Sequence, residues 1–425
     1  MGVIRIVFED GGGSLGPLTD LRIAAEVRSG AFTGVERLQA AALFVPADRE
    51  AALRARTTLP VNALPKGSRF LLLNGRLLEA PAEAAKLGQG EAITDPTDGC
   101  MLAACVDREQ ASEWLAGREP SLKKSPAAAP AVLRRPWDLL ANEAFERRLI
   151  QDAETLRAQW KWEGELAKPS QVAAWRNEKG KSWAMRWTGK RTRPIAFEGD
   201  AVFVHASARV DAFAVLDSRG GPVVIDRDAV IGSHAVLQGP VYVGPATQVA
   251  PHALLKPRTV FGPRCRAAGE VGGTIFHGDS NKAHDGHLGD SIVGRWVNLG
   301  AGTVNSNLLN TYGEVSMRVD AGSPLERTGR QFMGCILGDH VKTAIGTRIM
   351  TGTTVGTGAM IACSVPPPTC TPRFAWLTDD GQKVHRLDRF LATAEIVLKR
   401  RGVALDPAER AALQALHAKS AGSAS

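Results

Sequence analysis

The sequence predicts an α/β domain followed by a parallel β-solenoid with helices at its end. An apolar run at residues 3–8 precedes a glycine-rich turn, after which helical and strand patterns alternate to about residue 115. From residue 201, aliphatic residues recur at every sixth position. Past residue 376 an apolar stripe returns with helical spacing, which predicts packing helices.

The composition is that of an ordinary soluble protein with more than one domain. The 425 residues are 44% hydrophobic and 23% charged, which is long for a single core. A net charge of +8 suits anionic small molecules such as nucleotides and phosphates and is only weak evidence for nucleic acid as a partner. The six cysteines form no CxxC pair, so we expect reduced thiols and a cytoplasmic protein. The first residues predict neither a signal peptide nor a membrane span.

The α/β domain is expected over residues 1–155. The apolar run "VIRIVF" at 3–8 indicates a buried strand, and "EDGGGSLGPLTDLR" indicates a turn after it. An Ala-rich helical stretch begins near Gly34, and "RFLLLNGRLL" at 69–78 predicts another strand. A Pro/Ala-rich connector at 119–136 leads into a helical pattern.

Residues 156–200 are predicted to form a basic, Trp-rich linker. Lysines and arginines alternate there with Trp160, Trp162, Trp175, Trp183 and Trp187. Basic stretches with aromatics can bind single-stranded nucleic acid. The favoured interpretation is a linker whose tryptophans pack on neighbouring domains, because no nucleic-acid-binding motif accompanies them.

Residues 201–375 are predicted to be a β-helix because a sustained period of six fits neither a helix nor a flat strand. Each coil would have three short parallel strands, each with one aliphatic residue pointing inward. The pattern breaks at 276–286 and at 306–332, and insertions on a solenoid usually lie on its functional face. Residues 376–425 are predicted to be helical. The periodic positions are Ile225, Ile231, Leu237, Val243, Val249, Leu255, Phe261 and Ala267, then Leu337, Thr343, Ile349, Val355 and Ile361.

The stretch "HGDSNKAHDGH" at 277–287 places three histidines within eleven residues. His277, His284 and His287 could hold zinc as three imidazoles with a water, as in a carbonic anhydrase built on a β-helix. One of them could instead transfer a proton, because imidazole titrates near neutral pH. They could also be ordinary polar loop residues. The spacing alone does not decide between these three interpretations.

The six-residue repeat and the segment "NKAHDGHLGDSIVGRWVNLGAGTVNSN" resemble the bifunctional N-acetylglucosamine-1-phosphate uridyltransferase/glucosamine-1-phosphate acetyltransferase family. The whole chain is similar to a divergent branch of sugar nucleotidyltransferases, and the C-terminal resemblance covers about residues 275–363. It implies a left-handed parallel β-helix of hexapeptide repeats that assembles as a homotrimer, with acetyl-CoA bound between subunits.

The resemblance also implies roles for individual residues. His284 matches the general base that accepts a proton from the sugar amine, and the Ala301 backbone N–H matches the oxyanion donor. Lys282 could meet the sugar phosphate, while Asn298 and Asn307 match amino-sugar ligands. His287 stands where the family has a tyrosine that contacts the sugar. The continuation "VNLGAGT" favours a general base over zinc, so we predict no metal ligand.

A weaker resemblance covers the N-terminal domain, which would be nucleotidyltransferase-like and Rossmann-like. Sugar nucleotidyltransferases have G-x-G-T-R-L-x-P-L-T after a strand, and this chain has "DGGGSLGPLT". Ser14 stands where the family has an arginine that stabilises the leaving pyrophosphate. Gly75 is followed by Arg76, whereas the family has a Gly-Asp pair whose aspartate would bind Mg²⁺ beside a nucleoside triphosphate. The residues expected to bind nucleotide are Gly12, Gly13, Ser14, Thr19, Arg22 and Arg28.

These observations predict a cytoplasmic transferase. Its β-helix would transfer acetyl from acetyl-CoA to an amino-sugar phosphate or a nucleotide-amino sugar. Its N-terminal domain would bind a nucleotide or sugar phosphate with weak or absent nucleotidyl transfer. Two alternatives stay open: a non-catalytic regulatory trimer that binds nucleotide or sugar phosphate, and a zinc enzyme of the carbonic anhydrase type.

Overall fold

The computed structural model describes residues 3–140, 142–164 and 196–422. Most of the predicted Trp-rich linker therefore lies outside the described residues. The chain divides into two compact units, one of residues 1–138 with 391–425 and one of residues 139–390. The predicted boundary between residues 155 and 156 falls inside a helix, α4 (Asn142–Glu163), which groups with the second unit.

The first unit confirms the predicted α/β domain. Its six-stranded sheet has the order β2-β1-β3-β5-β4-β6, with parallel pairing in the β2-β1-β3 half and antiparallel pairing around β5. The strands are β1 (Ile4–Phe8), β2 (Ala42–Phe44), β3 (Arg69–Asn74), β4 (Glu91–Thr94), β5 (Met101–Asp107) and β6 (Lys123–Pro126). The α-helices are α1 (Gly34–Arg37), α2 (Ala47–Arg54), α3 (Arg108–Leu115) and α7 (Pro407–Gly422), and the 3₁₀ helices are η1 (Ala24–Glu26) and η2 (Ala82–Lys86).

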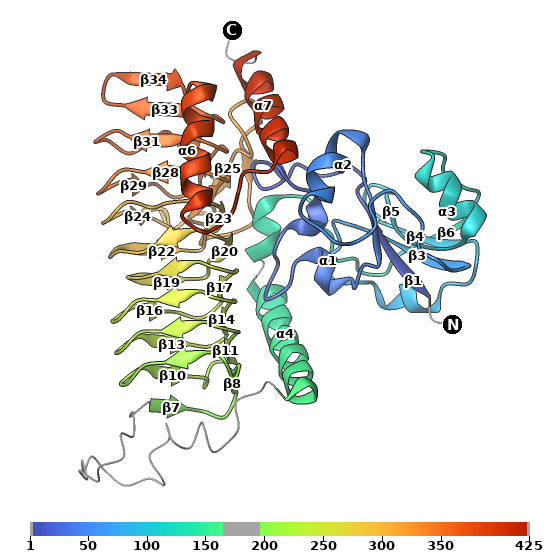
Figure 1. Cartoon of the computed structure of the whole chain (residues 1–425), viewed down its shortest axis with the longest axis horizontal. Helices are drawn as coiled ribbons and strands as arrows, with labels where there is room; N and C mark the ends of the chain where they lie inside the picture. The colour runs from blue at the N-terminus through green and yellow to red at the C-terminus, as the bar shows by residue number, and fades with distance from the viewer. Residues whose placement is uncertain (1–2, 141, 165–195, 423–425) are drawn as a thin grey trace. The chain divides into compact units, whose positions relative to one another are not determined.

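The second unit confirms the predicted parallel β-helix (Figure 1). Its longest sheet has β8 (Val202–Val204), β11 (Val223–Ile225), β14 (Val241–Val243), β17 (Thr259–Phe261), β20 (Ile275–Gly278), β23 (Ile292–Arg295), β27 (Cys335–Leu337), β30 (Thr353–Val355) and β32 (Cys370–Thr371). The second has β7 (Ala196–Glu198), β10 (Val215–Asp217), β13 (Val236–Gln238), β16 (Leu254–Leu255), β19 (Glu270–Gly272) and β22 (His287–Gly289). The third has β9 (Arg209–Val210), β12 (Val230–Ile231), β15 (Gln248–Val249), β18 (Arg266–Ala267) and β21 (Asn281–Lys282).

The later coils continue with shorter pairings. The remaining strands are β24 (Val304–Asn305), β25 (Ser316–Met317), β26 (Glu326–Arg327), β28 (Lys342–Thr343), β29 (Arg348–Ile349), β31 (Met360–Ala362), β33 (Ala375–Thr378) and β34 (Gly381–Val384). η3 (Pro136–Leu140) and α6 (Leu387–Lys399) connect the two units along the chain. No helix in the described ranges combines the length and apolarity needed to cross a membrane.

The six-residue period is confirmed by burial. Apart from Thr343, every predicted periodic position belongs to one continuous apolar core, and Ile231, Leu237 and Val243 have no exposed surface. Trp160 of α4 is also buried and packs edge-on against His205, with ring centroids 5.2 Å apart. Trp160 thus packs against the protein, as the favoured interpretation of the Trp-rich stretch expects of its tryptophans.

The two predicted interruptions differ. Residues 306–332 do leave the coil, and they carry the β25–β26 hairpin. The histidine stretch, in contrast, is not an insertion, because β20, β21 and β22 keep their places in the three sheets. Val243 pairs with Phe261, eighteen residues on, whereas Phe261 pairs with Phe276, only fifteen residues on. The period breaks there because one coil is shortened.

Candidate functional site

A cavity of about 120 Å³ opens at the carboxyl end of β1 in the first unit. Ligands of α/β sheets bind at this end of the strands. Four of the six residues predicted to bind nucleotide line the cavity, namely Gly12, Gly13, Thr19 and Arg22. Its other lining residues are Glu9, Gly11, Leu15, Ile23 and Arg49.

The other two predicted residues lie outside this cavity. Ser14 is exposed, and its backbone N–H donates to the Arg134 carbonyl oxygen at 3.0 Å. Arg28 is 7% exposed and donates to the Ala31 carbonyl oxygen. Arg28 therefore stabilises its own loop, and the structure gives it no part in the cavity.

Glu9 and Arg49 are cavity residues that the sequence analysis missed. Glu9 directly follows β1, which could have indicated it, whereas Arg49 comes from α2 and belongs to no local motif. Burial raises the pKa of the Glu9 carboxyl, although the Ala24 N–H donates to it at 2.8 Å. Arg49 donates to the Asp20 carbonyl oxygen at 2.9 Å.

The glycine turn lies against an ion pair whose guanidinium is buried. Arg76 is 2% exposed, and its Nη2 lies 2.6 Å from Asp10 Oδ2. Burial alone would raise the pKa of Asp10, but hydrogen bonds from Arg76 and Asn74 hold it below its ordinary value. A Cβ on Gly12 would lie 2.7 Å from Arg76 Nη2, so a larger residue here would have to displace this guanidinium.

This ion pair bears on whether Mg²⁺ fits the first unit. Mg²⁺ is held through carboxylates and other oxygens. At the position where the family places its metal-binding aspartate, this chain has the guanidinium of Arg76, and that guanidinium already neutralises Asp10. The residues present do not fit the metal at this position.

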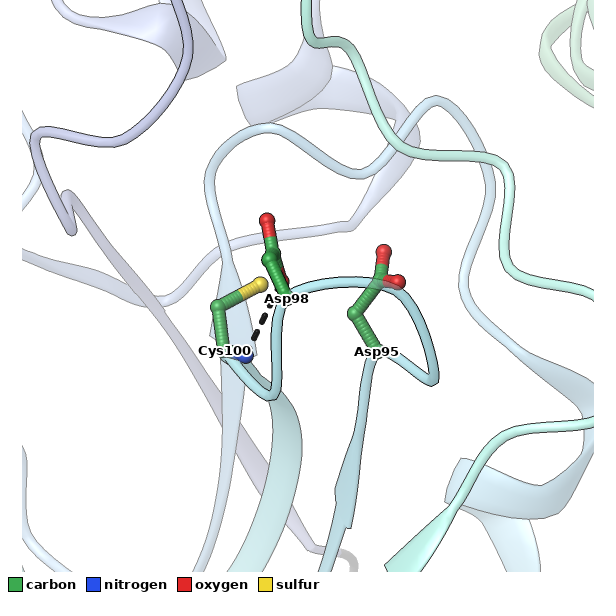
Figure 2. Close-up of side chains that lie close together, drawn as sticks. All are labelled: Asp95, Asp98 and Cys100. Carbon is green, nitrogen blue, oxygen red and sulfur yellow. Dashed lines mark hydrogen bonds between the residues drawn. The ribbon is translucent and has the colours of Figure 1, made fainter.

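A second group near the turn has metal-ligating residue types. Figure 2 shows Asp95, Asp98 and Cys100, whose ligand atoms lie within 4.8 Å of one another. Asp95, however, forms an ion pair with Arg134. Burial raises the pKa of the Cys100 thiol to about 11, and only the thiolate binds metal well. The group is better described as part of a charge network with arginines than as a metal site.

His284 and Ala301 lie on the same corner of the β-helix. Asn281 pairs with Asn298 in neighbouring coils, so the residues three positions later, His284 and Ala301, lie in register. Neighbouring strands are about 4.8 Å apart. Both residues are exposed, and the Ala301 N–H donates no hydrogen bond within the described part of the chain. An exposed imidazole thus lies next to a free backbone donor.

Lys282 lies in the interior of the β-helix, which contradicts its expected contact with a sugar phosphate. It pairs with Ala267 at an inward position and is 1% exposed. Its Nζ donates to the carbonyl oxygens of His284 and Asp285, the latter at 3.0 Å. Burial lowers the pKa of Lys282 to about 8. Lys282 therefore holds the backbone that carries His284.

His287 belongs to a chain of charged groups on the adjoining face. Lys256 Nζ lies 3.1 Å from Glu270 Oε1, and the Lys256 ammonium lowers the pKa of Glu270. The same carboxylate oxygen lies 3.3 Å from His287 Nδ1. Because a carboxylate only accepts, His287 donates through Nδ1, and its Nε2 is the nitrogen left to accept a proton.

His287 and Asn307 meet across a glycine. A Cβ on Gly289 would lie 2.7 Å from His287 Nε2 and 2.8 Å from Asn307 Nδ2. Asn307 also donates to Asp290 Oδ2 at 2.7 Å. Asn298, in the coil after His284, is exposed, and its Oδ1 accepts a hydrogen bond from Asn281 at 3.1 Å. Polar groups suited to a sugar thus line two neighbouring coils.

The three histidines of the short stretch lie on different parts of the coil. His277 is 5% exposed in β20, His284 is exposed at a corner, and His287 is half-buried in β22. Within the described residues of a single chain they do not form a group with nitrogens close enough to share a metal ion.

A family model matches the first part of the chain. Residues 5–160 match the model of the sugar nucleotidyl transferase family. This part of the chain is thus similar to sugar nucleotidyl transferases. The matched residues include the β1 strand and the cavity, and they extend through most of α4.

Several curated proteins are similar to parts of this chain. The bifunctional sugar-1-phosphate nucleotidylyltransferase/acetyltransferase of Sulfurisphaera tokodaii is 33% identical over 143 residues, 33% of this chain and 35% of that protein. The bifunctional protein GlmU of Methanocaldococcus jannaschii is 31% identical over 121 residues, 28% of each chain. The chain thus spans about a third of the length of the curated relatives it matches.

One solved structure that was matched to this chain is the UDP-N-acetylglucosamine acyltransferase of Francisella novicida. It is 15% identical, with 51% of this chain and 74% of that chain covered at a TM-score of 0.30. That likeness is too low to support an argument.

Proposed function

We propose that the β-helix transfers an acetyl group from acetyl-CoA to the amine of an amino-sugar phosphate or a nucleotide-amino sugar. The sugar nucleotidyl transferase domain would bind the nucleotide or sugar phosphate. The observation that carries the proposal is the shared corner, where an exposed imidazole lies in register with an unpaired backbone N–H. The relatives named as bifunctional nucleotidylyltransferase/acetyltransferases support it.

The proposed reaction needs one base and one oxyanion donor. The amine nitrogen attacks the thioester carbonyl carbon while His284 accepts its proton. The Ala301 N–H donates to the oxygen that becomes negative in the tetrahedral intermediate. The C–S bond then breaks, and the imidazolium returns the proton to the leaving thiolate. Lys282 keeps the His284 backbone in place throughout.

His287 is a second candidate for the base. Its Nδ1 is oriented by Glu270, whose negative charge would stabilise the imidazolium formed when Nε2 accepts a proton. A carboxylate oriented in this way typically supports a catalytic histidine. We assign the base to His284 because it alone lies in register with Ala301, and we assign His287 to binding of the acceptor together with Asn298 and Asn307.

The test of this function is thioester release from acetyl-CoA with a panel of amino-sugar phosphates and nucleotide-amino sugars. Acceptor-dependent release of the thiol, with an N-acetylated product, supports the proposal. If no amino-sugar acceptor stimulates release, the protein is better described as a non-catalytic binding trimer. The six cysteines are free thiols, which fits a reaction placed in a reducing cytoplasm.

We expect the protein to form a homotrimer in solution. Exposed apolar residues of the β-helix unit include Phe213, Ile345, Met350 and Val365, with Ile345 79% exposed and in register with Ala301. Contact with a neighbouring subunit would cover these apolar side chains. Light scattering at micromolar concentration should give three times the chain mass. A monomer mass would contradict an acyl-transfer site shared between subunits.

We expect weak or absent release of pyrophosphate from UTP or dTTP with a sugar 1-phosphate. Ser14 replaces an arginine, and loss of one contact that stabilises transition-state charge costs about 10²–10³ in rate. Arg28 cannot replace it, because it lies outside the cavity. Rapid pyrophosphate release that is abolished by Arg22→Ala would show that Arg22 has taken over this role.

A further inference from the structure

We propose that the cavity at the glycine turn binds the phosphate of a phosphate monoester through protein cations and backbone donors alone, without a divalent metal ion. This inference deepens the proposed role of the sugar nucleotidyl transferase domain and rests on it. The ligand would be a sugar phosphate that also carries a hydroxyl or ammonium donor close to the phosphate.

The size of the cavity limits what enters it. Pockets for complete small molecules typically measure about 300–1,000 Å³. A cavity of about 120 Å³ is smaller, so it accommodates one phosphate group and the atoms next to it rather than a whole nucleotide. A triphosphate with its base and ribose would extend far outside the lining residues.

The glycine turn offers backbone donors to an anion. Gly11 and Gly13 have φ angles of +67° and +74°, while the intervening Gly12 does not have a positive φ. Successive residues that alternate in this way point their N–H groups into one concavity, which is a common anion site. The Gly12 N–H donates to Asp10 Oδ1 at 2.9 Å, but in the described chain the Gly11 and Gly13 N–H groups donate to no protein acceptor.

Two arginines supply positive charge beside these donors. Arg22 is 7% exposed, and Arg49 has a side chain that is 36% exposed, so one cation is fixed within the wall and the other can move toward a ligand. Guanidinium groups match the geometry of phosphate oxygens. The Arg22 Nη1 donates to the Leu18 carbonyl oxygen at 3.0 Å, which orients the group.

Glu9 determines the other part of the ligand. Its carboxyl lines the same cavity, where a second phosphate would be repelled. A carboxyl can accept a hydrogen bond from a hydroxyl or an ammonium group. The cavity therefore favours a monoester of a hydroxylated or aminated compound over a diphosphate or triphosphate.

The ion pair beneath the turn makes Asp10 unsuitable as a ligand for a divalent metal ion. Asp10 is the acidic residue closest to the turn in sequence, and Arg76 holds it through Nε and Nη2, with Nε 2.9 Å from Oδ1. A divalent cation would have to displace a buried guanidinium from its carboxylate, leaving that guanidinium unpaired. The protein's own cations thus take the role that Mg²⁺ has in the family.

The test is calorimetric titration of the full-length protein with glucosamine 1-phosphate and, separately, with inorganic phosphate, each in EDTA and in Mg²⁺. We expect binding in EDTA with an affinity that Mg²⁺ does not raise. Arg49→Ala should weaken binding by about tenfold or more, the loss of a charge-assisted hydrogen bond. Arg49→Lys should restore part of it. Arg54→Ala is the matched control, because Arg54 lies on α2 but pairs with Glu50 outside the cavity.

Manganese binding gives a second readout. Electron paramagnetic resonance with Mn²⁺ should show no stoichiometric ion in the protein, with or without the sugar phosphate. Binding that requires Mg²⁺, a stoichiometric Mn²⁺ signal, or a failure of both phosphates to bind under either condition would overturn the inference. Binding that Arg49→Ala leaves unchanged would do so too, since it would lie at another site. If no acceptor supports acetyl transfer but metal-free binding depends on Arg49, the proposed acetyltransferase function fails while this inference holds.

Discussion

Replacement of His284 by alanine is expected to lower kcat for acetyl transfer by about 10²–10⁴, the usual contribution of a general base. The trimer and binding of acetyl-CoA should persist. His284 is exposed, and the packing of the β-helix depends instead on inward residues such as Ile231 and Leu237. The measurement is kcat with the preferred amino-sugar acceptor, beside circular dichroism to show that the fold is retained.

Variants of the other two histidines serve as comparisons. His287→Ala should raise KM for the acceptor more than it lowers kcat, as expected when ground-state and transition-state contacts are lost together. His277→Ala should leave kcat nearly unchanged and lower stability instead, because His277 is buried in β20.

Two results would contradict the assignment of the base. A His284→Ala enzyme that retains more than about a tenth of wild-type kcat has not lost a general base. If His287→Ala and Glu270→Gln each lower kcat by more than His284→Ala does, the Glu270–His287 pair is the proton acceptor. The pH dependence of kcat should then change in Glu270→Gln, because the carboxylate that favours the imidazolium has been neutralised.

The β-helix could be predicted from the sequence because each of its short strands places one aliphatic side chain inward. That geometry repeats every six residues and resembles no other regular structure. The histidine stretch resembles an insertion in the sequence because the coil before it is shortened. A shortened coil and an insertion both interrupt the six-residue spacing. The distinction needs the strand pairing of Phe261 with Phe276.

Lys282 shows where residue type misled the sequence analysis. Lysines are almost always exposed, and the family resemblance implied that Lys282 could meet the sugar phosphate. The structure places Lys282 after Ala267 in the inward column, where its ammonium reaches backbone carbonyls at the corner. The six-residue spacing predicts the inward position of Lys282 only once the coil before it is known to be shortened.

Part of the N-terminal cavity could be predicted because several of its lining residues are close together in the sequence. Gly12, Gly13, Thr19 and Arg22 belong to one continuous motif, so a resemblance over a few residues could locate them. Arg49 reaches the cavity from α2, and Arg76 reaches the turn from the end of β3. Contacts between residues this far apart in the chain depend on sheet topology, which no local pattern encodes.

Replacement of Lys282 by methionine is expected to lower kcat by up to about 10²-fold, the cost of a misplacement of about 1 Å in a catalytic group. The methionine fills the interior but no longer donates to the His284 and Asp285 carbonyl oxygens, so the corner that carries His284 relaxes. KM for the amino-sugar phosphate should stay unchanged, because Lys282 does not reach the surface. Lys342→Met is a comparison and not a neutral control, since Lys342 is half-buried, has a pKa lowered to about 8 and pairs with Asn298 in the neighbouring coil.

The stability of the Lys282 variant gives an independent check. Burial lowers the pKa of Lys282 from 10.5 to about 8 in the folded protein. Below pH 8 the lysine is protonated in both states, and the full cost of burying its charge is present. Between pH 8 and 10.5 the unfolded chain holds more protons than the native one, so this lysine makes stability rise with pH. Thermal unfolding should show a smaller gain over this range in Lys282→Met than in wild type. A rise in KM with unchanged kcat, together with an unaltered pH profile of stability, would instead place Lys282 at the substrate.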